Sequence, residues 1–191
     1  MRREFSTQTL VLIPVAIALN LAVGQLVLAL KLPLYLDSIG TILVGVLAGP
    51  WAGALTGFLA NVIWTATGWF PQAIAFAGVA AIIGALAGAF ARAGWLKLWW
   101  RAALAGVITG LVAAVVSAPI AAYVFGGVMG SGTDALVVLF RQAGLDALGA
   151  NMAQGTFSDP LDKTISYLIV WGLLRALPRS FSARFAGESA A

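Results

Sequence analysis

The stretch LYLDSIGTILVGVLAGPWAGALTGFLANVIWTATG, from Leu34 to Gly68, decides the fold. Its first apolar run opens after Asp37 and is broken by Gly49-Pro50, where proline lacks an amide donor and restricts the residue before it. Neither run reaches the roughly 20 residues that cross a hydrocarbon core unaided. We therefore expect two short helices that other helices shelter from lipid. Their predicted bounds are 34–48 and 51–67.

The composition of the chain predicts an integral membrane protein. Of its 191 residues, 61% are hydrophobic and 9% are charged, whereas charged residues make up about 25% of soluble domains. Long runs rich in glycine and alanine favour a helical bundle over a β-barrel. The natural partner of such a chain is a lipid bilayer, and we expect no nucleic-acid partner.

Several kinds of chemistry are excluded by the residue types. The chain has no cysteine and no histidine, so thiol nucleophiles, imidazole metal sites and Ser-His triads are impossible. It also lacks the GxxxxGK[ST] phosphate-binding loop, so it cannot hydrolyse ATP by itself. No arrangement of nucleophile and base is visible. We therefore expect neither an enzyme nor a bound metal or cofactor.

The apolar runs predict a single all-α domain over residues 1–191 with six membrane spans. The predicted spans are 8–30, 34–48, 51–67, 71–91, 102–125 and 160–178. Between the last two lies an outer segment, 126–158, in which an amphipathic helix is expected. Its polar face would carry Asp134, Arg141, Gln142 and Asp146. Asp159 is expected to cap the last span ahead of Pro160.

The basic residues set the orientation, because they concentrate in cytoplasmic segments. With six crossings, one side receives Arg2, Arg3, Arg92, Lys97, Arg101, Arg175, Arg179 and Arg184. The other side receives Lys31, Arg141 and Lys163. This bias predicts that both termini are cytoplasmic. A re-entrant pair of helices at 34–67 that does not cross the membrane would leave the later segments on the same sides, and this alternative remains possible.

Several motifs, in this order, resemble the substrate-binding S components of energy-coupling factor (ECF) transporters. They are the short helix entered through Asp37, the Gly49-Pro50-Trp51 turn, a Gly/Ala-rich third helix, DPLDK at 159–163 and RALPRSF at 175–181. The resemblance covers nearly the whole chain and is closest to the riboflavin-transporter-like branch, although riboflavin itself is not carried over. It implies capture of a vitamin or related micronutrient near the outer face of the cell membrane. It also implies docking on a coupling membrane subunit that works with two cytoplasmic ATPases.

The candidate ligand contacts lie on the predicted outer half and are polar or aromatic. They are Asp37, Thr41, Asn61, Trp64, Gln72, Asn151, Asp162 and Lys163. An acid, amides and aromatic rings suit a small, flat, polar ligand. Five of them have a structural alternative: Asp37 could cap the helix that follows it, Asn61 and Trp64 could hold helices together, and Asp162 with Lys163 could form an interface ion pair.

The first span carries small residues at helical spacing, Ala16, Ala18, Ala22 and Gly24, which let another helix approach closely. The resemblance implies that Ala18 and Ala22 form the docking surface for the coupling subunit. Asn20 lies among these residues, and a buried amide in this position needs a hydrogen-bond partner.

Two other function classes fit the same composition. A membrane sensor or signalling module would share the helical bundle. A small oligomeric channel would need a continuous polar stripe through a span, and the uncharged 102–125 run does not supply one.

Overall fold

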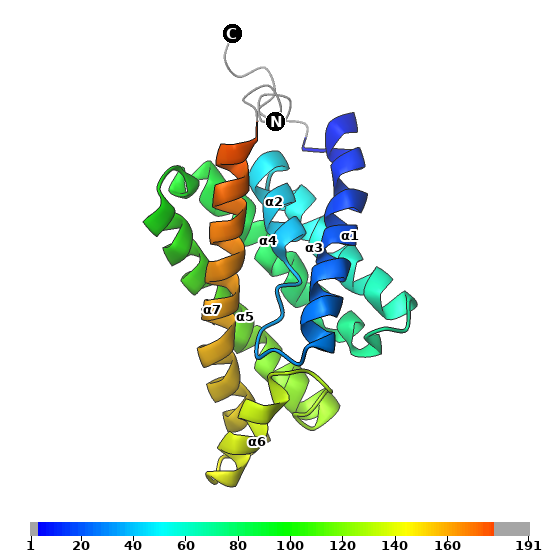
Figure 1. Ribbon diagram of the computed structural model, residues 1–191, viewed down its shortest axis with the longest axis vertical. Coiled ribbons are helices and arrows are strands. Elements are labelled where there is room, and N and C mark those ends of the chain that lie inside the picture. The colour runs from blue at the N-terminus through cyan, green and yellow to red at the C-terminus, as the bar shows by residue number, and fades with distance from the viewer. Residues whose placement is uncertain (1–3, 178–191) are drawn as a thin grey trace.

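The computed structural model describes residues 4–177, and over that range the chain is helical and contains no β-strand (Figure 1). The helices in chain order are α1 (Thr7–Ala29), α2 (Ile39–Ala48), α3 (Pro50–Ala66), the 3-10 helix η1 (Pro71–Phe76), α4 (Ala77–Arg92), the 3-10 helix η2 (Trp95–Lys97), α5 (Trp99–Phe125), α6 (Asp134–Gln142) and α7 (Ala147–Ala176). Helix α1, the segment from η1 through α4, and α5 are long and apolar enough to cross a membrane. The chain is a helical membrane protein.

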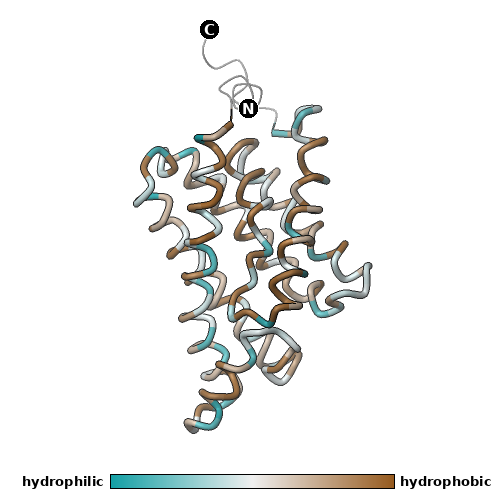
Figure 2. The backbone as a smooth tube through the Cα atoms, in the orientation of Figure 1, coloured by the Kyte–Doolittle hydropathy of each residue, from teal (hydrophilic) through white to brown (hydrophobic). Residues whose placement is uncertain are grey.

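Helix α7 combines a spanning length with polar residues. Its 30 residues give a length of about 45 Å, which exceeds the roughly 30 Å of a hydrocarbon core. Figure 2 shows hydrophilic segments along this helix, whereas most of the bundle is coloured as apolar. Asp159, Asp162 and Lys163 are nevertheless buried. The polar residues in the middle of α7 therefore face protein rather than lipid.

One end of the bundle, here called the basic end, gathers the start of α1, the α2–α3 turn and the end of α4. The Glu4 carboxylate accepts a hydrogen bond from the Trp51 amide over 2.8 Å and forms an ion pair with Arg92. Arg175, in the last turn of α7, donates to the Lys97 carbonyl over 3.0 Å. These contacts fix which helix ends lie together, because each joins segments that are far apart in the sequence.

The opposite end, here called the α6 end, joins the α1–α2 segment to the α5–α6 segment (Figure 1). The Lys31 ammonium donates to the Gly130 carbonyl over 2.5 Å, and the hydroxyls of Tyr35 and Thr133 lie 2.9 Å apart. The basic residues of the two chain ends are outside the described range: Arg2, Arg3, Arg179 and Arg184. Three of the basic residues within the described range, Arg92, Lys97 and Arg175, lie at the basic end.

The break predicted at Gly49-Pro50 is confirmed. Helix α2 ends at Ala48, and Pro50 opens α3 at a position where its missing amide donor costs nothing. Gly49 between them has φ +120°, a conformation that residues with a side chain rarely adopt. The first short helix is shorter than predicted, because residues 34–38 form a non-helical connection and α2 begins at Ile39.

Glycine contacts hold the short helices inside the bundle. A methyl group on Gly84 of α4 would lie 2.1 Å from the Gly53 carbonyl oxygen of α3, and one on Gly57 would lie 2.2 Å from the Ala80 carbonyl oxygen. Real side chains do not approach this closely, so α3 and α4 touch backbone to backbone. Such contacts are typical of membrane helices, which gain stability from close packing rather than from a hydrophobic driving force.

The predicted outer segment 126–158 is divided between two helices. Asp134 opens α6, and its Oδ2 accepts hydrogen bonds from the backbone amides of residues 129, 130 and 131. Arg141 and Gln142 end α6, whereas Asp146 caps α7 by accepting from the Gly149 amide over 2.7 Å. Residues 147–158 therefore belong to α7 and extend the last helix.

The prediction that Asp159 caps the last helix is wrong. Pro160 lies inside α7, which runs through it without a break. A proline interrupts one backbone hydrogen bond, and membrane helices tolerate this where neighbouring helices pack against the site. Here α5 supplies that packing, since a methyl group on Gly110 would lie 2.4 Å from Pro160 Cα.

The partner required by Asn20 is present. The Asn20 side chain donates to Thr41 Oγ1 over 2.8 Å and accepts from the Gly40 amide over 2.7 Å, and it is almost completely buried. Gly40 lies in the first turn of α2, where backbone amides have no partner within the helix. Asn20 thus supplies from α1 the acceptor that α2 lacks.

We predict that Asn20→Leu destabilises the protein by about 1–3 kcal/mol, because it leaves the buried Gly40 amide without an acceptor. Thermal unfolding in detergent would measure this as a lower apparent melting temperature. Gln25→Leu is the matched control on the same helix, since the buried Gln25 Oε1 accepts no hydrogen bond within residues 4–177. Equal melting temperatures for the two variants would contradict the role given to Asn20.

Candidate ligand-binding cavity

A cavity of about 100 Å³ lies among α2, α3, α4, α5 and α7, in the half of the bundle toward the α6 end. Its polar lining comes from the α1–α2 connection and from α2, α3, α5 and α7. Aromatic rings of Tyr35, Trp64, Phe70 and Phe76 form part of the wall. The Trp64 and Phe70 ring centres are 5.7 Å apart. The cavity therefore combines polar groups with flat apolar surfaces.

Six of the eight predicted ligand contacts line this cavity: Asp37, Thr41, Asn61, Trp64, Asn151 and Lys163. Gln72 and Asp162 do not line it. Gln72 belongs to the 3-10 turn η1, which the sequence analysis assigned to a regular helix. Asp162 is completely buried behind the cavity wall, where its carboxylate accepts hydrogen bonds from backbone amides.

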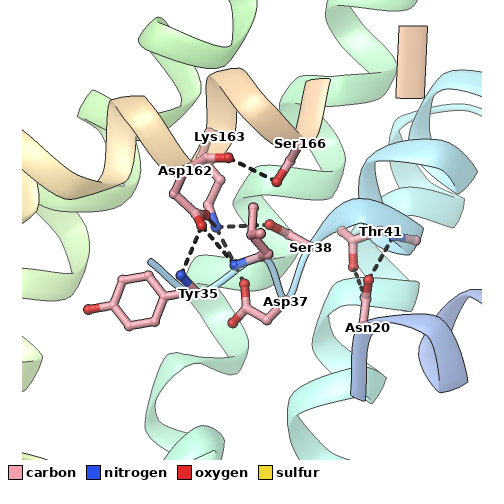
Figure 3. A network of polar contacts seen from close by, with 10 residues as sticks. Asn20, Tyr35, Asp37, Ser38, Thr41, Asp162, Lys163 and Ser166 are labelled. Carbon is pink, nitrogen blue, oxygen red and sulfur yellow. Dashed lines mark hydrogen bonds and ion pairs between the residues drawn. The ribbon is translucent and has the colours of Figure 1, made fainter. Parts of the chain in front are cut away.

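The Asp162 carboxylate joins α7 to the α1–α2 connection (Figure 3). Its Oδ1 accepts hydrogen bonds from the amides of Tyr35 (2.9 Å) and Leu36 (2.7 Å), and its Oδ2 accepts from Lys163 Nζ (2.5 Å). Asp162 and Lys163 are both buried, where a charge is tolerated when it is paired and hydrogen-bonded. Asp162 is therefore a structural anchor in this conformation.

Lys163 uses its hydrogen-bonding capacity within the protein. Its ammonium donates to Asp162 Oδ2, to Ser38 Oγ over 2.8 Å and to Asp37 Oδ1 over 3.4 Å. An ammonium group has three donors. Although Lys163 lines the cavity, its three N–H groups are all directed at protein oxygens (Figure 3).

The capping interpretation of Asp37 is wrong. Ser38 is the N-cap residue of α2, and no side chain makes a capping hydrogen bond there. The Asp37 carboxylate instead faces Lys163, and its side chain is 29% exposed. One oxygen accepts the long bond from Lys163, so most of the hydrogen-bonding capacity of this carboxylate is directed into the cavity.

Three residues that line the cavity carry a polar group without a partner among residues 4–177. Trp64 Nε1 and Gln154 Nε2 are buried donors that make no hydrogen bond. Asp159, which is 6% exposed, forms no ion pair or side-chain hydrogen bond with the described residues. Such groups are rare in native proteins, because leaving one unpaired costs about 1–3 kcal/mol. The Asp159 carboxylate in particular is available to a ligand in the cavity.

Sequence reasoning missed Tyr35, Ser38, Ser117, Gln154 and Asp159 as lining residues. Gln154 and Asp159 lie in α7 five residues apart. The Asp-Pro pair led to a predicted helix start at Asp159, so the residues before it were assigned to the outer segment rather than to the last helix. A helix continued through Pro160 would have placed Asn151, Gln154 and Asp159 along a single element.

Comparison with known proteins assigns no family: the chain matches no family model, no curated protein sequence and no solved structure.

We predict that Asp162→Leu destabilises the protein by about 3–5 kcal/mol, because it removes the nearest carboxylate from the buried Lys163 ammonium and leaves two backbone amides without their acceptor. The double variant Asp162→Leu/Lys163→Met removes both charges. Its melting temperature in detergent is expected to lie above that of the single variant. A double variant that melts below the single one would contradict the proposed pairing, whereas Leu161→Ala, at an exposed neighbouring position, should melt like the parent.

Proposed function

We propose that the chain is the membrane-embedded substrate-binding subunit, or S component, of an ECF-type transporter. It captures a vitamin or related small micronutrient at the outer face of the cell membrane and delivers it for ATP-driven uptake by partner subunits. The observation that carries the proposal is the cavity near the α6 end, with its aromatic wall and its unpartnered buried polar groups.

The orientation follows from charge. Arg92, Lys97 and Arg175 gather at the basic end, and basic residues favour the cytoplasmic side. The basic end is therefore placed in the cytoplasm, together with both termini. The cavity then lies in the outer half of the membrane, where it can receive a ligand from outside. In this arrangement α1, α2, α3, α4, α5 and α7 make the six crossings.

The need for partners follows from what the sequence lacks. Without a phosphate-binding loop the chain cannot use ATP by itself, so two cytoplasmic ATPases and a coupling membrane subunit are the proposed partners. An energy source outside the chain is required for uptake against a gradient.

The outer face of α1 suits contact with a coupling subunit. Ala18 and Ala22 are exposed on it and are flanked by Val15 (62% exposed) and Leu26 (60% exposed). Gly24 of the same helix packs inward, because a methyl group there would lie 2.5 Å from the Trp64 ring. The small residues of α1 thus divide between internal packing and a smooth outer stripe that a partner helix can approach closely.

We predict that the parent protein, purified from membranes of its native host, carries the coupling subunit and both ATPases, identified by mass spectrometry. Ala18→Trp/Ala22→Trp should lose these partners and uptake while still binding ligand, because two indoles hold the facing helix away. Leu111→Trp/Val115→Trp, an exposed pair at the same spacing on α5, is the control and should keep both. A parent that binds ligand but carries no ATPase would instead favour a sensor module.

We predict the orientation from cysteine labelling in intact cells, which is unambiguous because the chain has no cysteine of its own. Ala93→Cys, exposed at the basic end, should be protected from an impermeant maleimide. Gln142→Cys, exposed at the end of α6, should react. Reaction of both positions from outside would contradict the six-crossing arrangement.

A further inference from the structure

We infer that the ligand of the cavity is a small, positively charged, single-ring nitrogen heterocycle that places its charge against Asp37 and Asp159 and an acceptor group against Trp64 and Gln154. This inference rests on the proposed binding function and names the class of its substrate. Four observations carry it: the charge balance at the cavity, the unpartnered groups on residues that line it, the aromatic wall and the size.

The charge balance at the cavity is negative. Asp37 and Asp159 line it and Asp162 lies directly behind, against the single ammonium of Lys163. Asp162 and Lys163 satisfy each other, and Lys163 directs its other donors to Ser38 and, over a long 3.4 Å, to one oxygen of Asp37. Two carboxylates therefore remain for whatever fills the cavity.

Other cationic side chains of the α6 end do not offset this charge. Lys31 donates to the Gly130 carbonyl and Arg141 to the Gly126 carbonyl, and both hydrogen bonds are exposed. Neither residue lines the cavity. Lys163 lies one turn beyond Asp159 on α7, yet no ion pair joins them among the described contacts. A buried carboxylate without such a partner favours a cation beside it.

The lining favours an organic cation over a metal ion. Within residues 4–177 no group of three acidic side chains gathers closely enough to hold a metal ion. The walls contributed by Trp64, Phe70 and Phe76 suit a delocalised charge, because the faces of aromatic rings attract cations. A flat cation can stack on these rings while its edge meets a carboxylate.

Two hydrogen-bond donors of the protein indicate what the ligand carries on the side away from its positive charge. Trp64 and Gln154 line the cavity, and their buried Nε1 and Nε2 atoms donate to nothing among the described residues. An acceptor such as a carbonyl oxygen would satisfy one or both of them. The ligand thus carries a positive charge and a neutral acceptor on one small frame.

The size of the cavity limits the ligand to about one ring. Its volume is about 100 Å³, whereas drug-sized ligands occupy pockets of about 300–1,000 Å³. An engineered cavity of about 150 Å³ takes up benzene, so even a single ring requires the walls of this cavity to move outward when it binds. A fused three-ring ligand does not fit this conformation.

The test uses a matched charge series on one ring: 1-methylnicotinamide, a permanent cation; nicotinamide, which is neutral; and nicotinate, an anion. Affinities are measured by calorimetry on the purified full-length protein, with melting shifts in detergent as a second readout. We expect the cation to bind at least about tenfold more tightly than the neutral compound, and the anion to bind most weakly. Equal or tighter binding of the neutral or anionic compound, or no binding of the cation, overturns the inference.

The variant Asp159→Asn assigns the effect to a residue. Removing its charge should weaken binding of 1-methylnicotinamide by about ten- to a hundredfold and leave nicotinamide nearly unchanged. Asp146→Asn is the matched control on the same helix, since asparagine caps a helix as well as aspartate and this residue lies outside the cavity. If Asp159→Asn still prefers 1-methylnicotinamide over nicotinamide as strongly as the parent does, the inference is contradicted. Asparagine resembles a protonated, uncharged Asp159, so that result would mean that the charge of Asp159 does not attract the ligand.

Failure of this inference and failure of the transport proposal look different. A protein that carries the ATPase subunits but prefers nicotinamide or nicotinate remains a transporter subunit with a different substrate. A protein that shows the cation preference but carries no ATPase binds the inferred ligand for another purpose.

Discussion

The structure depends on the buried pair formed by Asp162 and Lys163. The connection between α1 and α2 has no helix to satisfy its amides, and an apolar environment offers no water in place of one. Leu36 adopts φ +48°, a left-handed conformation that is unusual for leucine, and its amide and that of Tyr35 meet the same carboxylate oxygen. Lys163 then reaches Ser38 at the start of α2. The two residues of α7 thus hold a strained segment in place.

The position of this anchor depends on α7 remaining a single helix. Asp159, Asp162 and Lys163 occupy just over one turn of it, so they project toward neighbouring elements from one short segment. If the helix had started at Pro160, Gln154 and Asn151 would belong to a loop and could not share the cavity with them. The continuity of α7 through its proline therefore sets the composition of the cavity wall.

Small residues shape the cavity from the other side. Gly57, Ala60, Ala113, Ala118 and Ala121 line it and contribute little volume. Next to them, glycine contacts bring α3 and α4 into backbone contact. Small side chains let these helices pack closely. Where small side chains on two facing helices point at each other without backbone contact, they leave space between the helices. The abundance of glycine and alanine in the sequence therefore has two consequences, close packing and a ligand-sized space.

Much of the architecture could be predicted from local sequence signals. The Gly49-Pro50 break and the need of Asn20 for a partner follow from backbone chemistry and from the cost of burying an amide, and both are confirmed. The role of Asp162 could not be predicted, because it depends on amides that are 126 and 127 residues away in the chain. Asp159 was misassigned because an Asp-Pro pair normally marks a helix start, and the packing of α5 that allows an interior proline is invisible to a local pattern.

The shortness of α2 has a consequence for how the protein is made. Its 10 residues rise about 15 Å, half the thickness of a hydrocarbon core. A segment of this length does not partition into the bilayer as an independent unit during synthesis. It can be held there once α7, which is translated after it, supplies Asp162 and Lys163 to the segment at its start. Stable insertion of α2 is therefore expected to follow the synthesis of α7.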